Sequence, residues 1–199
     1  MGINKAVAKG VFLDRDGVIN RNVLNKATGE LESPHSPEDF ELFSWSIVSL
    51  QWLLESKYQL FLISNQPSYA KRKTSLENIR AVHDKFHSLM KANGISFAEY
   101  YYCYHHPQGI VPELSIQCDC RKPGLLFLKE AQKKYSFNMG LCWMVGDRNS
   151  DIICGQNGGV RTILIQNPDE SQSMSTLHCN PEFKAANLLE AVSIIIRES

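Results

Sequence analysis

The chain has 199 residues, and its 21 Lys and Arg residues balance its 21 Asp and Glu residues, so the formal net charge is zero. Proteins that bind nucleic acid or anionic membranes through their overall field carry a basic excess, so the sequence argues against both partners. This length is typical of one domain with its own apolar core. We expect a single domain over residues 1–199 in which any anion is recognised locally.

The sequence shows no membrane segment and no disulfide framework. No run approaches the ~20 apolar residues that a spanning helix needs, and the first residues, Met-Gly-Ile-Asn-Lys, lack the apolar region of a signal peptide. Three of the six cysteines lie between positions 103 and 120 beside histidines, which favours a metal site over disulfide bonds. We therefore expect a cytoplasmic protein.

The first predicted elements alternate between strand and helix. Apolar runs at 11–13 and 59–63 are typical of buried parallel strands. Apolar residues at helical spacing predict a helix over 47–54 between them. A capping-box pattern from Thr74 to Glu77 then opens a longer helix, which Gly94 ends.

The same alternation continues to the end of the chain. The later elements are predicted as strands over 97–103, 142–145 and 160–165, and as helices over 125–135, 150–156 and 187–197. A long irregular loop over 104–123 and a polar stretch over 166–181 interrupt them. This order predicts an α/β fold with a doubly wound, mainly parallel sheet, and no inserted segment is long enough for a separate cap domain.

Two carboxylates follow the first predicted strand. Asp14 could attack phosphorus and form an acyl-phosphate, which divides one hard displacement into two easier ones. Asp16 could protonate the leaving alkoxide and later deprotonate water, and Gly17 permits the turn that brings it over the site. Alone, the segment also fits an acidic turn without a catalytic role, because Asp-Gly is a common turn dipeptide.

Further polar residues lie where phosphoryl oxygens would be bound. Ser64, Asn65 and Gln66 follow the second strand with hydroxyl and amide groups, although in isolation they also fit a polar turn. Lys122 could supply a cation to the transferring phosphoryl group. Alternatively, Lys122 could be a solvated loop residue without a catalytic role, because most lysines are exposed to solvent.

A third acidic segment follows the strand predicted over 142–145. Asp147 would be placed to hold Mg²⁺ together with Asp14, because hard cations prefer carboxylate oxygens. Asp151 could support this loop or the water shell of the metal, or could interact favourably with the N-terminus of the following helix.

The ordered set of Asp-x-Asp-Gly, Ser-Asn, Lys and Gly-Asp-x-x-x-Asp resembles the haloacid dehalogenase (HAD) superfamily of phosphohydrolases. The resemblance implies that Asp14 is the nucleophile and Asp16 the general acid/base. Ser64 and Lys122 would steady the phosphoryl group. Mg²⁺ would be held by Asp14, Asp147 and the backbone carbonyl of Asp16.

A second motif indicates zinc. A Cys-x-His pair and a Cys-x-Cys pair flank one loop, and their ligand residues are Cys103, His105, Cys118 and Cys120. Three thiolates and one imidazole make a closed, structural Zn²⁺ site, from which the loop over 103–120 would gain its order. His106 is an alternative ligand that the spacing does not exclude.

The remaining cysteines and two histidines give no ligand pattern. We expect Cys142, Cys154 and Cys179 to serve in packing. His83 and His87 are four residues apart on a predicted helix without an adjacent carboxylate motif, and we expect both at the surface.

The zinc loop narrows the resemblance within the superfamily. The stretches 12–20, 101–109, 118–123 and 143–147 resemble the bacterial D-glycero-D-manno-heptose 1,7-bisphosphate 7-phosphatases. The related histidinol-phosphate phosphatases share the zinc ligands with a shorter loop. The resemblance implies a small phosphorylated sugar as substrate, the heptose 1,7-bisphosphate, which is converted to the 1-phosphate for outer-surface polysaccharide assembly.

A bisphosphate also needs cations for the phosphate that does not react. The candidates are Lys71, Arg72, Lys73 and Arg121, although a basic turn is often only solvated. Asn65 and Gln66 are further candidates for substrate contacts. The open pocket of a protein without a cap suits a monomer.

The sequence is compatible with three other functions. A histidinol-phosphate phosphatase is the nearest alternative enzyme. A polynucleotide 3′-phosphatase would share the Asp-x-Asp-Gly chemistry, but zero net charge and the lack of an aromatic-basic stripe argue against it. A non-catalytic binding module on the same fold is the third, and the presence of both Asp14 and Asp16 argues against it.

Overall fold

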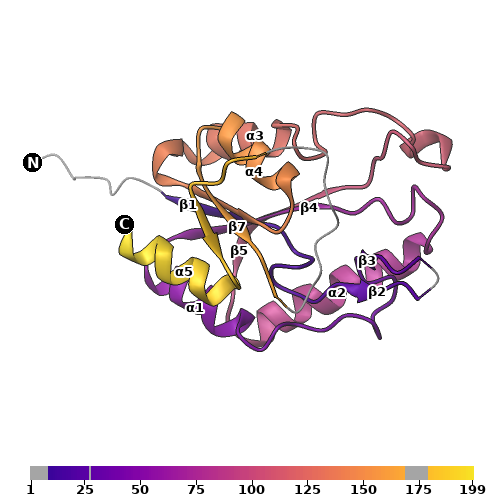
Figure 1. Ribbon diagram of the computed structural model, residues 1–199, viewed down its shortest axis with the longest axis horizontal. Helices are drawn as coiled ribbons and strands as arrows, with labels where there is room; N and C mark the ends of the chain where they lie inside the picture. The colour runs from indigo at the N-terminus through magenta and orange to yellow at the C-terminus, as the bar shows by residue number, and fades with distance from the viewer. Residues whose placement is uncertain (1–8, 27, 169–178) are drawn as a thin grey trace, which may run out of the picture.

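A six-stranded parallel sheet forms the centre of the computed structural model, which describes residues 9–26, 28–168 and 179–199 (Figure 1). The strand order is β5-β4-β1-β6-β7-β8, and each neighbouring pair is parallel. These strands are β1 (Gly10–Leu13), β4 (Gln59–Asn65), β5 (Phe97–Cys103), β6 (Trp143–Gly146), β7 (Arg161–Ile165) and β8 (Phe183–Ala185). The doubly wound sheet predicted from the sequence is confirmed.

Helices cover both faces of the sheet (Figure 1). One side carries α1 (Ser46–Glu55), α2 (Leu76–Ala92) and α5 (Leu188–Arg197), and the other carries α3 (Leu126–Tyr135) and α4 (Asn149–Asn157). In β1, which is buried on both faces, Val11 and Leu13 enter the larger core while Phe12 enters the smaller one. Because β1 is covered on both sides, its sequence is an uninterrupted apolar run.

The structure adds elements that the sequence did not predict. They are the short hairpin of β2 (Val23–Leu24) and β3 (Leu31–Glu32), the edge strand β8, and the 3₁₀ turns η1 (Pro112–Leu114) and η2 (Met139–Leu141). The hairpin follows the strand that leads to Asp14, and within the described residues no folded cap domain accompanies it. None of the described helices combines the length and apolarity that crossing a bilayer requires.

The capping box predicted at the start of α2 is wrong by one residue. Ser75 is the N-cap, and its hydroxyl accepts a hydrogen bond from the Asn78 amide at 3.1 Å. The Thr74 hydroxyl instead donates to the His35 carbonyl at 2.6 Å and so ties α2 to the segment that follows the hairpin. Gly94, with φ of 68°, follows the helix end as expected.

Candidate active site

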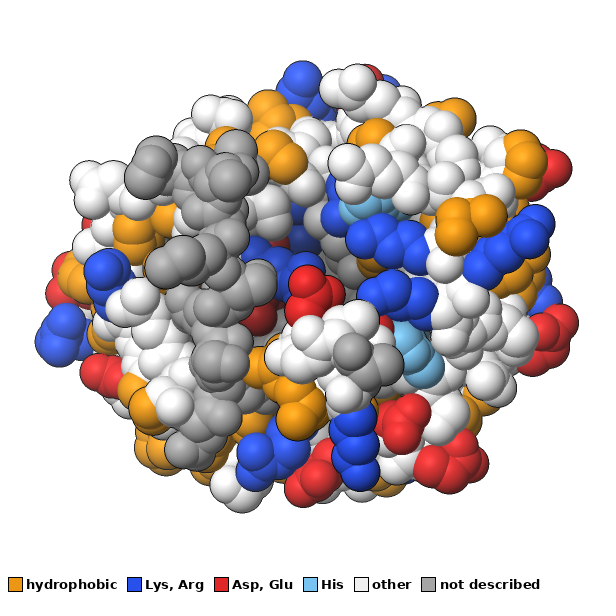
Figure 2. Space-filling model, turned by 45° about the vertical axis from the view of Figure 1, so that its right-hand side comes forward, with side chains coloured by type: hydrophobic (Ala, Val, Ile, Leu, Met, Phe, Trp, Pro, Cys, Tyr) orange, Lys and Arg blue, Asp and Glu red, His pale blue; other side chains and the backbone are white. Residues whose placement is uncertain are grey.

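The carboxyl ends of β1, β4 and β6 meet at one edge of the sheet, and an open pocket of about 210 Å³ lies there. Asp14 follows β1 directly, and its amide donates to the Val145 carbonyl of β6 at 3.0 Å. Figure 2 shows the hollow on this face, with acidic side chains inside it and Lys, Arg and His side chains around it. Parallel sheets place ligands at this edge.

Lys122 lies between two carboxylates inside the pocket. Its Nζ atom is 3.0 Å from Asp14 Oδ1 and 2.7 Å from Asp151 Oδ1, and it donates to the Ile63 carbonyl at 2.6 Å. Burial alone would lower the pKa of Lys122, but Asp14 and Asp151 raise it above the ordinary lysine value. Lys122 is therefore a fixed positive charge beside Asp14.

Asp151 interacts with the start of α4, which was one of the alternatives for it, and it also contacts Lys122, which was not foreseen. It is fully buried, and its Oδ2 accepts the Arg148 amide at 2.9 Å at the start of α4 while Oδ1 contacts Lys122. This position requires glycine at 146, because a Cβ atom there would lie 2.2 Å from the Cβ of Asp151. Asp151 caps the helix and holds the lysine.

Three carboxylates converge as a hard cation requires. Asp14, Asp147 and Asp151 each offer an oxygen, and these oxygens lie within 4.8 Å of one another. Burial and the charges of the other two carboxylates raise the pKa of Asp147 well above its usual range. Asp147 Oδ1 is buried and has no hydrogen-bond partner among the described residues. These observations fit Mg²⁺.

Gly17 allows Asp147 to come close to the turn after β1. Its φ is +80°, which L side chains rarely adopt, and a Cβ atom there would lie 2.3 Å from Asp147 Oδ2. The Asp-Gly turn therefore serves the carboxylate cluster and is more than a surface feature.

The carboxylate of Asp16 is held by several donors. Its Oδ1 accepts from Arg15 Nε at 3.1 Å and from Asn20 Nδ2 at 2.9 Å, and its Oδ2 accepts from Gln66 Nε2 at 2.6 Å. Burial opposes ionisation of Asp16, but Arg15, Asn20 and Gln66 outweigh it and lower the pKa of this carboxyl group. Asp16 is therefore ionised at neutral pH.

The residues at the end of β4 and directly after it divide their roles differently from the prediction. The Gln66 side chain is directed to Asp16 and to Ser64, whose Oγ it contacts at 2.9 Å. The Asn65 side chain lines the pocket and also brackets the backbone of Lys122, accepting from its amide at 3.0 Å and donating to its carbonyl at 3.2 Å. Ser64 is buried where β4 ends.

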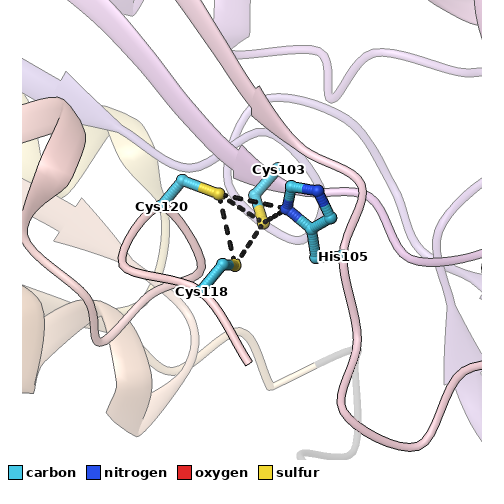
Figure 3. A group of neighbouring side chains, drawn as sticks. All are labelled: Cys103, His105, Cys118 and Cys120. Atoms are coloured by element: carbon cyan, nitrogen blue, oxygen red, sulfur yellow. Dashed lines mark hydrogen bonds between the residues drawn. The ribbon is translucent and has the colours of Figure 1, made fainter. Parts of the chain in front are cut away.

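The predicted zinc ligands come together beyond the end of β5, and their side chains point toward one another (Figure 3). The Sγ atom of Cys120 is 3.2 Å from those of Cys103 and Cys118, and 3.3 Å from His105 Nδ1. The Sγ atom of Cys103 is 3.6 Å from that of Cys118 and 3.8 Å from His105 Nδ1. Structural Zn²⁺ sites are built from four Cys and His ligands of this kind. The donor set, three thiols and one imidazole, therefore fits Zn²⁺.

The rival ligand His106 lies outside this cluster. Its Nδ1 accepts the Gln108 amide at 3.1 Å. The four-residue group within ligand distance contains His105 instead. The loop geometry thus separates two histidines that spacing alone could not distinguish.

The Cys/His cluster and the pocket share one segment. Arg121 and Lys122 directly follow Cys120, and Arg121 Nη1 donates to the His105 carbonyl at 3.4 Å. Because Asn65 also holds the backbone of Lys122, this segment is fixed from both sides.

The pocket rim carries four cationic side chains besides Lys122. These are Lys71, Lys73, Arg121 and Arg148. Arg148 was not predicted from the sequence, because it occupies a position that the pattern Gly-Asp-x-x-x-Asp leaves unspecified. Arg72 was predicted as a substrate cation, but it is exposed and does not line the pocket.

Lys73 already has an anionic partner at the rim. Its Nζ is 2.5 Å from Glu32 Oε1 on the hairpin. Among the described residues Lys71 has no such pair, and partial burial together with the neighbouring cations Lys73 and Arg121 lowers its pKa. Lys71 and Arg121 are therefore more available than Lys73 to an anion.

His83 is buried, so its predicted surface position is wrong. Its ring stacks on Tyr102 with centroids 3.8 Å apart, and its Nδ1 lies 3.3 Å from the Tyr104 hydroxyl. Burial lowers the pKa of His83 to about 3. The sequence did contain a signal for this burial. His83 lies at helical spacing from Ile79 and Phe86, and all three residues lie on the buried face of α2.

Comparison with known proteins agrees with the site. The HAD-hydrolase-like family model matches residues 119–191. The chain is 35% identical over 185 residues to the D-glycero-alpha-D-manno-heptose-1,7-bisphosphate 7-phosphatase of Photorhabdus laumondii, covering 92% of this chain and 97% of the relative. It is 30% identical to the D-glycero-D-manno-heptose-1,7-bisphosphate 7-phosphatase of Chlorobaculum tepidum, covering 94% and 93% of the two chains.

Solved structures show the same fold. The D,D-heptose 1,7-bisphosphate phosphatase from B. bronchiseptica, complexed with magnesium and phosphate, superposes with a TM-score of 0.76 at 23% identity, over 96% of this chain and 99% of that one. The corresponding enzyme from Burkholderia thailandensis gives 0.64 at 17% identity, over 94% and 98%. With its HAD-like fold and relatives matched over nearly their whole length, this chain belongs to the heptose-bisphosphate phosphatase family of HAD-type phosphoric monoester hydrolases.

Proposed function

We propose that this protein removes the 7-phosphate of D-glycero-D-manno-heptose 1,7-bisphosphate through a phosphoenzyme on Asp14. The observation that carries the proposal is the position of Asp14, which lies against the fixed charge of Lys122 and beside Asp147 and Asp151 in an open pocket. Relatives that span nearly the same length bear the name of this activity.

In the first step, a carboxylate oxygen of Asp14 attacks phosphorus, and the bond from phosphorus to the sugar oxygen breaks. Asp16 gives a proton to the departing alkoxide and becomes a carboxylate. Because Asp16 is ionised in the free protein, this proton arrives with the substrate, whose phosphate has a second pKa near 6. Lys122 contacts the phosphoryl oxygens, and Ser64, buried at the end of β4, supports the site through its contact with Gln66.

In the second step, water attacks the phosphorus of the aspartyl-phosphate. Asp16 takes a proton from this water, the bond between phosphorus and Asp14 breaks, and inorganic phosphate leaves. The Asp14 carboxylate is thereby restored.

Mg²⁺ would be held by Asp14, Asp147 and the backbone carbonyl of Asp16, and would offset the negative charge shared by nucleophile and phosphate. Asp14 and Asp147 fit this ion, because burial raises the pKa of both groups in the protein alone. The protein's own contribution is to fix these two carboxylates at the ends of β1 and β6.

Zn²⁺ would be held by Cys103, His105, Cys118 and Cys120, with no coordination position left for substrate. Its role would be structural, because the loop between the ligand pairs contributes few core residues. The six cysteines are unpaired, which suits the reducing cytoplasm in which we place the protein. We propose that it acts as a monomer.

The phosphate at position 1 would be bound at the rim of the pocket. Lys71 and Arg121 support this part of the proposal, since both line the pocket and neither is neutralised there by a carboxylate as Lys73 is by Glu32. Arg148 is a third candidate that faces the same space.

A panel assay of released phosphate tests the proposal. The purified chain with Mg²⁺ receives the alpha and beta anomers of the heptose bisphosphate, histidinol phosphate and a nicked DNA 3′-phosphate. Both anomers belong in the panel because the relatives are named for one or the other. We expect the highest kcat/KM for a heptose bisphosphate, and a preference for histidinol phosphate would reject the substrate.

Substitution of Asp14 tests the mechanism separately. Asp14→Asn replaces the attacking oxygen with an amide and should abolish turnover of every substrate. Asn keeps the size of the side chain, so circular dichroism should show the wild-type fold. Retained activity in this variant would reject the covalent mechanism.

A further inference from the structure

The side-chain amide of Gln66 connects two buried groups, the Asp16 carboxylate and the Ser64 hydroxyl. Its Nε2 atom donates to Asp16 Oδ2 at 2.6 Å and lies 2.9 Å from Ser64 Oγ. An amide nitrogen carries two hydrogens, so these two contacts account for both. Gln66 is buried and is not among the residues that line the pocket, so this nitrogen is not available to the substrate.

The other carboxylate oxygen of Asp16, Oδ1, is held by different donors. Oδ1 accepts from Arg15 Nε and Nη2 at 3.1 and 3.0 Å and from Asn20 Nδ2 at 2.9 Å. Arg15 and Asn20 are fully buried. Without Gln66, the one contact that Oδ2 would keep among the described residues is long, at 3.3 Å to Arg15 Nη2. Gln66 therefore provides the short contact that fixes Oδ2.

We infer that Gln66 is a positioning residue for Asp16 and not a substrate ligand: it ties the general acid/base to the end of β4. The inference rests on the proposed function, in which Asp16 acts in both steps. A carboxylate that serves two steps must face the leaving oxygen and then the attacking water. Hydrogen bonds from buried groups hold such an orientation without further reorganisation.

The two steps depend differently on Asp16. An aryl phosphate such as p-nitrophenyl phosphate loses a stable aryl oxide, so Asp14 can attack phosphorus and the bond to the aryl oxygen can break without a proton from Asp16. The second step still needs Asp16 to take a proton from water as the bond from phosphorus to Asp14 breaks. A misplaced Asp16 should therefore allow the phosphoenzyme to form and slow its hydrolysis.

The test is rapid-mixing kinetics of Gln66→Met, which keeps the length of the side chain and removes both donors. With p-nitrophenyl phosphate and Mg²⁺ we expect a burst of one nitrophenolate per chain, followed by a steady rate about 10-fold or more below wild type. KM should fall together with kcat, so that kcat/KM stays within about twofold of wild type, because the first step is unchanged. With the heptose bisphosphate we expect the same loss of kcat without a burst.

A matched control makes the same chemical change elsewhere. Gln156→Met removes an exposed amide that donates to the Asn180 carbonyl, and it should leave both rates unchanged. If Gln66→Met does not fold, Gln66→Leu, which also lacks the donors and carries no charge, should show the same burst.

The outcomes separate the inference from the proposed function. Wild-type turnover together with a Gln66→Met variant whose KM rises and which shows no burst would overturn the inference alone. A wild-type chain that hydrolyses neither substrate would overturn the proposed function. A burst and an acid-stable phosphoenzyme confined to the Gln66 variants would support both.

Discussion

Gly146 and Asp151 show how closely the residues of the site are packed. A Cβ atom at 146 would lie 2.2 Å from the Cβ of Asp151, and the carboxylate of Asp151 holds both Lys122 and the first turn of α4. No rotation of Asp151 relieves this contact, because its Cβ is fixed to the backbone.

Gly146→Ala should therefore displace Asp151 and release Lys122 from one of its two carboxylates. We expect kcat to fall about 100-fold, and the free energy of unfolding to drop by about 1–3 kcal/mol from overpacking. Released phosphate and urea unfolding measure the two effects. Gly140→Ala is the control, since a Cβ there would meet only Asn138 Oδ1 at 3.5 Å.

His83 should make the stability depend on pH. Its pKa is about 3 in the folded protein against an ordinary 6.5, so as pH falls below 6.5 the unfolded chain binds a proton that the folded chain does not. This contribution is complete above pH 6.5 and is lost progressively as pH falls toward 3. At pH 5.5 the loss is about 1.4 kcal/mol.

His83→Phe keeps a ring for stacking on Tyr102 and removes the titrating group. Urea unfolding at pH 7.5 and 5.5 should show a smaller decline for the variant than for wild type, by about 1.4 kcal/mol. An equal decline in both proteins would contradict the assignment.

The sequence predicted much of the site at this scale, because strand ends bring Asp14 and Asp147 to one edge whatever the details of packing. It did not predict the roles of Gln66 and Arg148. Their side chains meet partners that are distant in sequence, and single-residue chemistry does not specify which of several polar neighbours they contact. For Gln66 the partner is Asp16, 50 positions away.

The longer helices and strands were predicted from the sequence, but the shortest strands were not. β2, β3 and β8 have only two or three residues, which is too few for a periodic pattern to stand out. The hairpin matters for the site, because Glu32 on β3 pairs with Lys73 and Ser33 contacts Ser68 across the pocket rim.

We propose that the loop over 103–120 owes its order to a bound metal. Cys118→Ser should reduce bound zinc below one atom per chain and make the loop more sensitive to protease, because the loop has little core of its own. Activity should fall as well, since Arg121 and Lys122 follow the last ligand. Elemental analysis and limited proteolysis give the readouts.

Cys179→Ser provides the matched control for this prediction. Cys179 lies outside the cluster and donates to Asn149 Oδ1 at 3.1 Å. It should retain the wild-type zinc content. Full zinc occupancy in Cys118→Ser would contradict the proposed ligand set.

For the whole molecule, the carboxylate cluster opposes stability unless a cation is bound. The pKa of Asp147 is raised well above its usual range, so its ionised form at pH 7.5 destabilises the fold. The sign follows from linkage: a carboxyl group whose folded pKa is raised loses stabilisation as pH rises above its unfolded pKa.

Asp147→Asn should therefore raise the Tm of the protein in Mg²⁺-free buffer, by about 2–4 °C for each kcal/mol of relieved repulsion. Mg²⁺ should raise the Tm of wild type, because it binds the folded state, and should have little effect on the variant. Calorimetry with and without Mg²⁺ measures both. A lower Tm for the metal-free variant would contradict the predicted repulsion.

The position of β1 between β4 and β6 has a consequence for a chain emerging from the ribosome. Asp14 is made early, yet the strand that leads to Asp147 is synthesised more than a hundred residues later. Until that strand docks, the proposed nucleophile lacks one wall of its pocket, so a fragment that ends before β6 should not turn over substrate. Appearance of phosphatase activity during translation would thus time the moment at which the sheet closes around its central strand.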